Sequence, residues 1–250
     1  MNNISAIIIA RDEEDRIADC LDSISFCDEI IVVDNASSDR TSQIAQRMGA
    51  KVVNADFRDF SELRNLGLKK ASGELVLYID ADERVDPVLK KNIENIARGA
   101  DGASVYRVIR KNFYLGNREW PKTEKMERLF RRDDLKGWKG KLHESPIISG
   151  RSAELGGFLL HYTHRNLSQM LKKTIEWSKV EAELRYNAGH PRMSWWRFPR
   201  VMVGTFLNYY IVQGGYRIGT AGLVESMYQA FSIFVTYARL WELQNSKKND

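Results

Sequence analysis

Residues 75–84 have the sequence LVLYIDADER, an apolar run that ends in two aspartates. An uninterrupted apolar run of this length is typical of a β-strand that is covered on both faces. Asp80 and Asp82 follow it two residues apart, so on extended backbone their side chains point to the same side. Carboxylate and diphosphate oxygens suit Mg²⁺ or Mn²⁺, so the pair is a candidate cation site. A helix cap or a solvated turn is the alternative.

The surrounding residues repeat this pattern of strand followed by helix. Apolar runs at 4–9, 30–33 and 52–53 predict three more strands, and helical spacing predicts helices between them. We expect Ser38 or Asp39 to cap the second helix, Gly49 to end it, and Pro87 to start the helix after residue 84. The alternation predicts an α/β fold with a doubly wound, mostly parallel sheet. Ligands of such sheets bind at the carboxyl ends of the strands.

The second half of the chain is different. A strand is expected at 104–108, followed by a region rich in Arg, Lys and Trp up to about Pro146. Helical periodicity then predicts three helices, at about 167–186, 195–212 and 221–243. We therefore expect a catalytic domain at 1–165 and a helical C-terminal extension at 166–250. This extension faces a membrane, forms a dimer or packs on the catalytic domain.

The overall composition and charge bear on the partners and the cellular location of the protein. Hydrophobic residues are 43% of the chain, its formal charge is +5 and its pI is about 9.1, which favours anionic partners. No nucleic-acid-binding motif accompanies the charge. Cys20 and Cys27 lie seven residues apart, roughly 10 Å along a helix, too far for a disulfide. With neither a signal peptide nor a membrane span evident, a cytoplasmic protein is expected. Peripheral contact with the inner face of the cytoplasmic membrane stays open.

Two further side chains are candidates for nucleotide binding. Asp34 ends the predicted strand at 30–33, where it can accept a hydrogen bond from a uracil imide or a ribose hydroxyl. Arg64 lies on the helix before the acidic strand and can bind phosphate or ribose oxygens in bidentate fashion. The alternatives are an ordinary turn for Asp34 and a solvated surface arginine for Arg64.

Four short motifs follow one another along the chain: ARDEE at 10–14, VVDNASSD at 32–39, LRNLG at 63–67 and DADE at 80–83. Together they resemble the family 2 inverting glycosyltransferases, over roughly the first hundred residues. Three later stretches, KNFYLGNREWP at 111–121, ERLFRR at 127–132 and GWKGKLHE at 137–144, resemble a bacterial subgroup of that family. This subgroup includes lipopolysaccharide inner-core β-glucosyltransferases.

The resemblance implies the GT-A fold and transfer of glucose or another hexose from a UDP-sugar to a hydroxyl of a glycan or glycolipid, in lipopolysaccharide core or cell-surface polysaccharide synthesis. It implies that Asp82 ligates Mg²⁺ or Mn²⁺, with Asp80 on the ribose or on a metal-bound water. The rest of the implied donor site is a base and ribose pocket at Ala10, Arg11 and Glu13, uracil on Asp34, and diphosphate or ribose on Arg64. The family more often has Pro-Thr-Tyr after the first strand, where this chain has Ile9-Ala10-Arg11.

An inverting transferase also needs a carboxylate that deprotonates the acceptor hydroxyl. Glu144, in Leu142-His143-Glu144, is the candidate, since the resembling subgroup has the same His-Glu dipeptide. The rivals are Asp133, Asp134 and Glu124, and a purely structural His–Glu contact is the alternative.

Some basic side chains remain open to more than one interpretation. His161 is a candidate additional metal ligand or a packed histidine. Among the arginines at 128, 131 and 132, some are expected to bind diphosphate or an anionic acceptor, or else to form a solvated edge.

Two other functions compete with transfer. A sugar nucleotidyltransferase has a similar sheet but usually a glycine-rich basic loop after the first strand, and residues 10–13 contain no glycine. A non-catalytic adaptor could keep the fold and bind membranes or partners. A cluster rich in Trp and Arg suits a lipid head-group interface; the alternatives are a helical subdomain packed on the catalytic core and a dimer contact. Its members are Arg192, Trp195, Trp196, Arg197, Phe198 and Arg200.

Overall fold

The computed structural model describes residues 2–57, 59–99, 102–115, 117–140, 144–164 and 166–246, without the side chain of His164. The chain forms two compact units. The first, here the sheet unit, comprises Met1–Lys111 and Thr123–His161. The second, here the helical unit, comprises Asn112–Lys122 and Tyr162–Asp250. No helix among the described residues is long and apolar enough to cross a bilayer.

One mixed sheet forms the centre of the sheet unit, with strand order β3-β2-β1-β4-β8-β6-β11-β5. The first four of these pair in parallel, and antiparallel strands continue the sheet beyond β4. The α/β class and the parallel strands expected from the sequence are confirmed. The strands are β1 (Ile4–Ala10), β2 (Glu29–Asn35), β3 (Lys51–Ala55), β4 (Leu75–Asp80), β5 (Glu83–Val85), β6 (Val105–Tyr114), β7 (Arg118–Glu119), which pairs with β6, β8 (Glu124–Arg131), β9 (Leu135–Lys139), β10 (Ser145–Ile148) and β11 (Ser152–His164).

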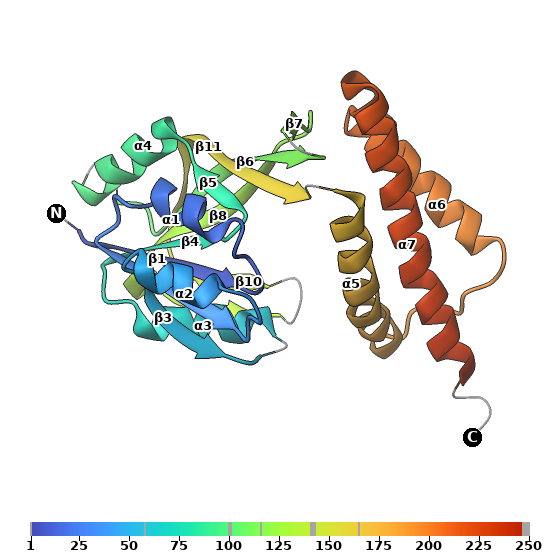
Figure 1. The fold of residues 1–250 in the computed structure, drawn as a ribbon, viewed down its shortest axis with the longest axis horizontal. Coiled ribbons are helices and arrows are strands. Elements are labelled where there is room, and N and C mark those ends of the chain that lie inside the picture. Colours follow the sequence, from blue (N-terminus) through green and yellow to red (C-terminus); the bar gives the residue numbers. More distant parts are fainter. Residues whose placement is uncertain are drawn as a thin grey trace. The chain divides into compact units, whose positions relative to one another are not determined.

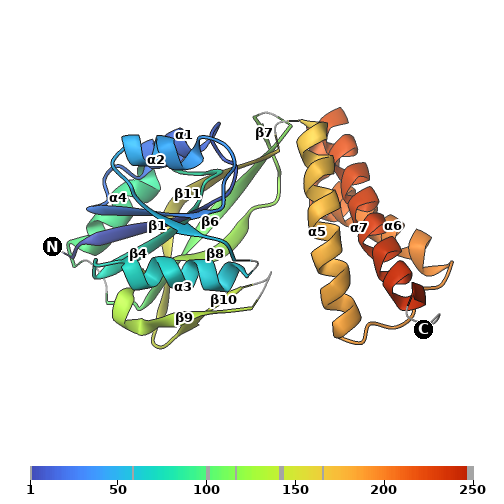
Figure 2. The same cartoon turned by 60° about the horizontal axis from the view of Figure 1, so that its bottom comes forward.

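Both faces of the sheet are covered. The helices α1 (Ile17–Ser23), α2 (Thr41–Arg47) and α4 (Pro87–Ala97) lie over one face, whereas α3 (Phe60–Lys70) and the small β9–β10 sheet lie over the other (Figure 2). Strand β4 shows why its sequence is apolar throughout. Leu75, Leu77 and Ile79 pack into one core, and Val76 and Tyr78 pack into the other. Burial on both sides removes the polar positions that a half-exposed strand needs.

The helix ends partly agree with the sequence. Pro87 is the first residue of α4, as predicted, and the Asp86 carboxylate caps that helix by accepting from the Leu89 backbone N–H at 2.7 Å. Of the two candidate caps for α2, which begins at Thr41, Ser38 is not used, because its hydroxyl and its backbone N–H both donate to Asp12. Asp39 does accept from the Thr41 backbone N–H, at 2.9 Å.

The helical unit contains α5 (Leu167–Asn187), α6 (Arg197–Leu207), a π-helical turn η2 (Asn208–Val212), a 3₁₀ turn η3 (Gly215–Ile218) and α7 (Thr220–Ser246) (Figure 1). The segment at 112–122 packs against these helices through Trp120, whose Nε1–H donates to Gln213 at 3.1 Å. Gly215 makes the packing feasible, since a Cβ there would lie 2.8 Å from the Trp120 ring. The helix expected at 195–212 begins instead at Arg197, and it changes from α to π geometry at Asn208.

Glu225 on α7 is a buried acid that predicts a pH-dependent stability. Its side chain has 0% exposure, and one carboxylate oxygen has no hydrogen-bond partner among the described residues. Burial raises its pKa from 4.5 to about 7, against a hydrogen bond from Gln229. Between pH 4.5 and about pH 7, Glu225 is ionised in the unfolded chain and still protonated in the folded one. Folding therefore becomes less favourable as the pH rises from 4.5 to 7, and the penalty persists above 7.

We expect Glu225→Gln to raise the unfolding temperature at pH 8 and to leave it unchanged near pH 4. A tenfold change in a proton-binding constant corresponds to about 1.4 kcal/mol, so the gain at pH 8 is on the order of 3 kcal/mol. Thermal unfolding followed by circular dichroism at both pH values measures it. Glu242→Gln removes an exposed carboxylate from the same helix and serves as the control. An equal effect of Glu225→Gln at both pH values would contradict a titrating origin.

Candidate active site

Polar residues at 11–14, 34–39 and 80–83, which follow three of the predicted strands, meet at one edge of the sheet. Strands β1, β2 and β4 are parallel neighbours, with Ala10 paired to Asp34 and Ile9 paired to Asp80. Their carboxyl ends therefore lie side by side, and each feeds a polar turn. This is the edge at which doubly wound sheets bind ligands.

The turns after β1 and β2 hold one another in place. Asp34 is buried, and its carboxylate accepts from both the hydroxyl and the backbone N–H of Ser37. Asp34 thus orders its own turn, which is the alternative to nucleotide binding that the sequence left open. Asp12 adopts a left-handed backbone with φ of 55°, and its carboxylate accepts from the Ser38 backbone N–H at 2.7 Å. Arg11, just before it, is exposed.

Glu13 continues the same turn. Its backbone N–H donates to the Thr41 hydroxyl at 2.8 Å, which links the turn to the start of α2. Its carboxylate lies 3.4 Å from Arg16. Ala10, Arg11 and Glu13 therefore line the strand ends next to Asp34, where a base and ribose pocket was expected from the sequence.

Asp80, the last residue of β4, accepts hydrogen bonds from two arginines. Arg128 Nη2 donates to its Oδ2 at 2.8 Å, and Arg64 Nη2 donates to its Oδ1 at 3.3 Å. Burial alone would raise the pKa of Asp80, but Arg128 and Arg64 outweigh it and hold the pKa well below the ordinary value. Asp80 is therefore an anion at any physiological pH.

Glu83 is a site residue that could not be found from the sequence. Its side chain is completely buried, and it accepts from Arg128 Nη2 at 2.7 Å, from Arg110 Nη1 at 3.3 Å and from the Asp80 backbone N–H at 2.9 Å. A charge this deeply buried needs such partners. Burial raises the pKa of Glu83, while Arg128 opposes the rise. The triad of Asp80, Glu83 and Arg128 fixes the backbone of the turn that carries Asp82.

Arg64 joins this cluster to the candidate base. Its Nε donates to Glu144 Oε1 at 2.8 Å, while its Nη2 reaches Asp80. The guanidinium carbon lies 4.8 Å from the Trp138 ring centre and 5.4 Å from that of Tyr78, so aromatic side chains hold it in place. Its third nitrogen, Nη1, is buried and has no hydrogen-bond partner among the described residues. A fixed cationic donor with an unused N–H is suited to an anionic ligand.

Asp82 has a different set of neighbours from Asp80. It lies in the turn between β4 and β5, and its Oδ2 is 3.2 Å from His161 Nε2 and 3.8 Å from Arg16 Nη1. His161 reaches this position because β11 pairs with β5 and places it opposite Glu83. An imidazole and a carboxylate at this distance can serve as two ligands of one divalent cation.

The structure separates the candidate bases. Glu144 contacts Arg64 within the site, although Leu142 and His143 of its motif lie outside the described residues. Asp133 and Asp134 follow β8, whose last residue Arg131 pairs with Leu75 at the start of β4. They therefore lie at the edge of the sheet opposite to Asp80.

The fourth candidate base and the neighbouring arginines are also placed. Glu124 is exposed and bonded to Arg110. Of the three arginines at 128, 131 and 132, Arg128 is the one buried against Asp80. Arg132 donates instead to the Ala71 carbonyl, away from these strand ends.

Comparison with known proteins agrees with the geometry. The sequence profile of glycosyl transferase family 2 matches residues 5–154. An uncharacterised glycosyltransferase of Rickettsia typhi is 28% identical, covering 100% of this chain and 90% of its own length. The lipopolysaccharide core biosynthesis glycosyltransferase LpsC of Rhizobium meliloti is 26% identical, covering 96% of this chain and 92% of its own length.

The fold is shared with solved structures. The structure of S. aureus TarS residues 1–349 in complex with UDP superposes with a TM-score of 0.50 at 15% identity, over 98% of this chain and 92% of that one. The complex of the same protein with UDP-GlcNAc gives a TM-score of 0.50 at 13% identity, with the same coverage. At these identities the likeness concerns the fold, which is the GT-A fold expected from the sequence.

Proposed function

Because the chain belongs to glycosyl transferase family 2, we propose that it transfers glucose or another hexose from a UDP-sugar, with inversion, to a hydroxyl of a glycan or glycolipid. The observation that carries this proposal is the link through Arg64. One guanidinium joins the acidic turn of the donor side to a separate carboxylate, Glu144, and keeps one N–H unused. A transferase needs this combination of an anion-binding group and a base within reach of the same reacting centre.

The donor occupies the edge formed by the ends of β1, β2 and β4. Ala10, Arg11 and Glu13 border the uracil and ribose, and Asp34 lies where it can accept from the uracil imide once a ligand competes with Ser37. Asp80 faces the ribose, and Arg64 binds the diphosphate through its unused N–H. The solved structures with the same fold contain UDP and UDP-GlcNAc, which supports a UDP-sugar as the donor.

A divalent cation, Mg²⁺ or Mn²⁺, fits the residues present. Asp82 and His161 supply one carboxylate oxygen and one imidazole nitrogen 3.2 Å apart, and diphosphate oxygens are natural further ligands of such ions. Asp80, whose two oxygens each already accept from an arginine, is better placed as an outer ligand. When bound, the cation supplies charge that stabilises the departing diphosphate.

Glu144 acts as the base. Arg64 holds Oε1 in a fixed position, and Oε2 remains to accept the proton of the acceptor hydroxyl as the hydroxyl oxygen attacks the anomeric carbon. The C–O bond to the diphosphate breaks on the opposite face, and Arg64 neutralises the negative charge that the leaving group gains.

The acceptor belongs to a cell-surface glycan, with lipopolysaccharide core as the preferred class, because LpsC carries that role in its name. Such acceptors are anchored in lipid. The helical unit exposes many large apolar side chains, among them Trp195 at 83% exposure. We therefore include in the proposal a cytoplasmic enzyme that contacts the inner face of the membrane through this unit. Co-sedimentation of the wild type with anionic vesicles tests this contact.

The donor site is tested by thermal shift with UDP, GDP, ADP and CMP, each with and without Mn²⁺. We expect a metal-dependent shift with UDP, since ligand at about 100 times Kd adds about 2.7 kcal/mol of stability. His161→Ala should raise the Mn²⁺ concentration needed for the shift at least about tenfold. His190→Ala in the helical unit is the matched control. If no nucleotide raised the unfolding temperature of the wild type, the donor site would be rejected and a non-catalytic adaptor would be favoured. An unchanged Mn²⁺ dependence in His161→Ala would remove His161 from the metal site.

A further inference from the structure

The helical unit contains a long basic segment with no acidic residue. From residue 184 to residue 224 the sequence has no Asp or Glu, and it contains the arginines at 185, 192, 197, 200 and 217. This segment spans the end of α5, all of α6 and both short turns before α7. Nothing in the donor or acceptor chemistry described above uses it.

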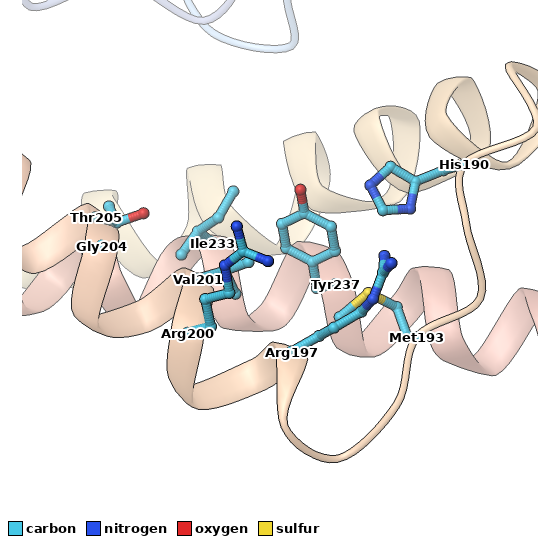
Figure 3. A pocket seen from close by; sticks show the side chains of 9 residues that line it. All are labelled: His190, Met193, Arg197, Arg200, Val201, Gly204, Thr205, Ile233 and Tyr237. Atoms are coloured by element: carbon cyan, nitrogen blue, oxygen red, sulfur yellow. The ribbon is translucent and has the colours of Figure 1, made fainter.

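A pocket of about 460 Å³ is lined by α6, α7 and the connection between α5 and α6. The polar side chains that line it are cationic or neutral, and the other lining residues are apolar side chains or glycine. In Figure 3, Arg200 extends from α6 toward Ile233 and Tyr237, and Arg197 extends toward His190. The lining residues are His190, Met193, Arg197, Arg200, Val201, Gly204, Thr205, Ile233 and Tyr237.

The two arginines of this pocket have no carboxylate partner among the described residues. Both guanidinium groups lie near the Trp196 ring instead, at 5.3 Å for Arg197 and 5.9 Å for Arg200. The nearby acid Glu181 is already paired with Arg185 at 2.7 Å, and Arg185 in turn donates to the Tyr237 hydroxyl at 3.1 Å. The pocket therefore has positive charge that the surrounding elements do not neutralise.

One of these arginines also belongs to an apolar surface. Trp196, Arg200, Val203 and Leu207 recur at the spacing of a single helix face, and the three apolar members are 43%, 56% and 43% exposed. Ile211 continues the same spacing and is also exposed. Arginine beside tryptophan on an otherwise apolar face is the composition of helices that lie in a bilayer interface.

We propose that this pocket binds the phosphate of an anionic phospholipid while the apolar face of α6 enters the surrounding head-group layer. The proposal rests on the membrane contact included in the proposed function and names the group that is recognised. Arg197 and Arg200 hold the phosphate oxygens, and the Tyr237 hydroxyl and His190 border them.

A lipid fits the pocket better than a second copy of this chain. In a symmetric dimer built on this face, both copies contribute the same residues, and the segment from 184 to 224 has no Asp or Glu to pair with the arginines of the other copy. An anionic surface instead supplies the missing charge, and it attracts basic residues that lie close to it.

The test compares binding of the full chain to vesicles of phosphatidylcholine alone and of phosphatidylcholine with phosphatidylglycerol, at fixed salt. The wild type should bind the mixed vesicles and not the neutral ones. Arg197→Gln with Arg200→Gln should lower binding to mixed vesicles about thirtyfold, from the usual contribution of two surface cations. Lys69→Gln with Lys70→Gln removes the same charge from exposed positions on α3 and should leave binding within about threefold. Circular dichroism and UDP binding confirm that each variant is folded.

The outcomes separate the two proposals. If the wild type binds no vesicles, the membrane contact itself fails, while transferase activity on a soluble acceptor remains testable. If the wild type binds but both double variants lose affinity equally, the effect is net charge and the pocket is rejected. Competition by inorganic phosphate at concentrations that do not screen the surface would show a free-anion site and overturn the lipid assignment. Dimerisation in gel filtration that the arginine variant abolishes would assign the face to a second copy.

Discussion

Asp82→Asn should abolish the metal-dependent thermal shift with UDP and lower kcat by roughly 10³-fold, the scale seen when charge stabilisation of a leaving group is lost. The substitution keeps the size of the side chain and removes the anionic oxygen that lies 3.2 Å from His161. The measurement pairs calorimetric titration of Mn²⁺ in the presence of UDP with initial-rate kinetics of hexose release from the donor.

Asp133→Asn is the control, because this carboxylate is exposed and lies at the opposite edge of the sheet. It should retain wild-type Mn²⁺ affinity and turnover. If Asp82→Asn bound Mn²⁺ and UDP as tightly as the wild type, the metal site would have to lie elsewhere. In that case Asp82 would be a structural partner of His161 and Arg16.

Glu144→Gln should lower kcat by about 10²- to 10⁴-fold while leaving UDP affinity near that of the wild type, the effect expected for loss of a general base. Glutamine can still accept from Arg64 Nε through its amide oxygen, so the link to Asp80 is kept. The same steady-state assay measures kcat, and the thermal shift with UDP measures donor affinity in parallel.

A structural role for Glu144 predicts different results. Loss of the Arg64 contact alone would weaken the donor affinity and lower kcat little. Glu124→Gln, which removes an exposed carboxylate bonded to Arg110, should reduce kcat little. If Glu144→Gln kept wild-type turnover, another base would be required.

The core elements of the sheet unit could be predicted from the sequence because each depends on neighbouring residues. Strand β4 is apolar on successive residues, so it must be covered on both faces, and it is. Pro87 fits the first turn of a helix whatever surrounds it. The π-helical end of α6 and the packing of Trp120 on Gly215 could not be foreseen, since both depend on contacts between segments far apart in the chain.

The candidate site divides in the same way. The sequence placed Asp34 and Asp80 at strand ends, and parallel neighbours necessarily bring such ends together. It contained no local sign of Glu83 as a buried partner, because the charges that stabilise it come from Arg110 and Arg128 on later strands. Burying one of these charges without the others would be strongly unfavourable, and their meeting depends on strand order.

Three properties could be predicted without coordinates: the alternation of strands and helices, the side of the sheet on which ligands bind and the family that the chain resembles. Local periodicity and turn chemistry suffice for these, because they act over a few residues. The folded chain was needed to show that Arg64 meets Glu144, 80 residues away, and that His161 meets Asp82, 79 residues away. Contacts at such separation depend on which strands become neighbours, and no local pattern encodes that pairing.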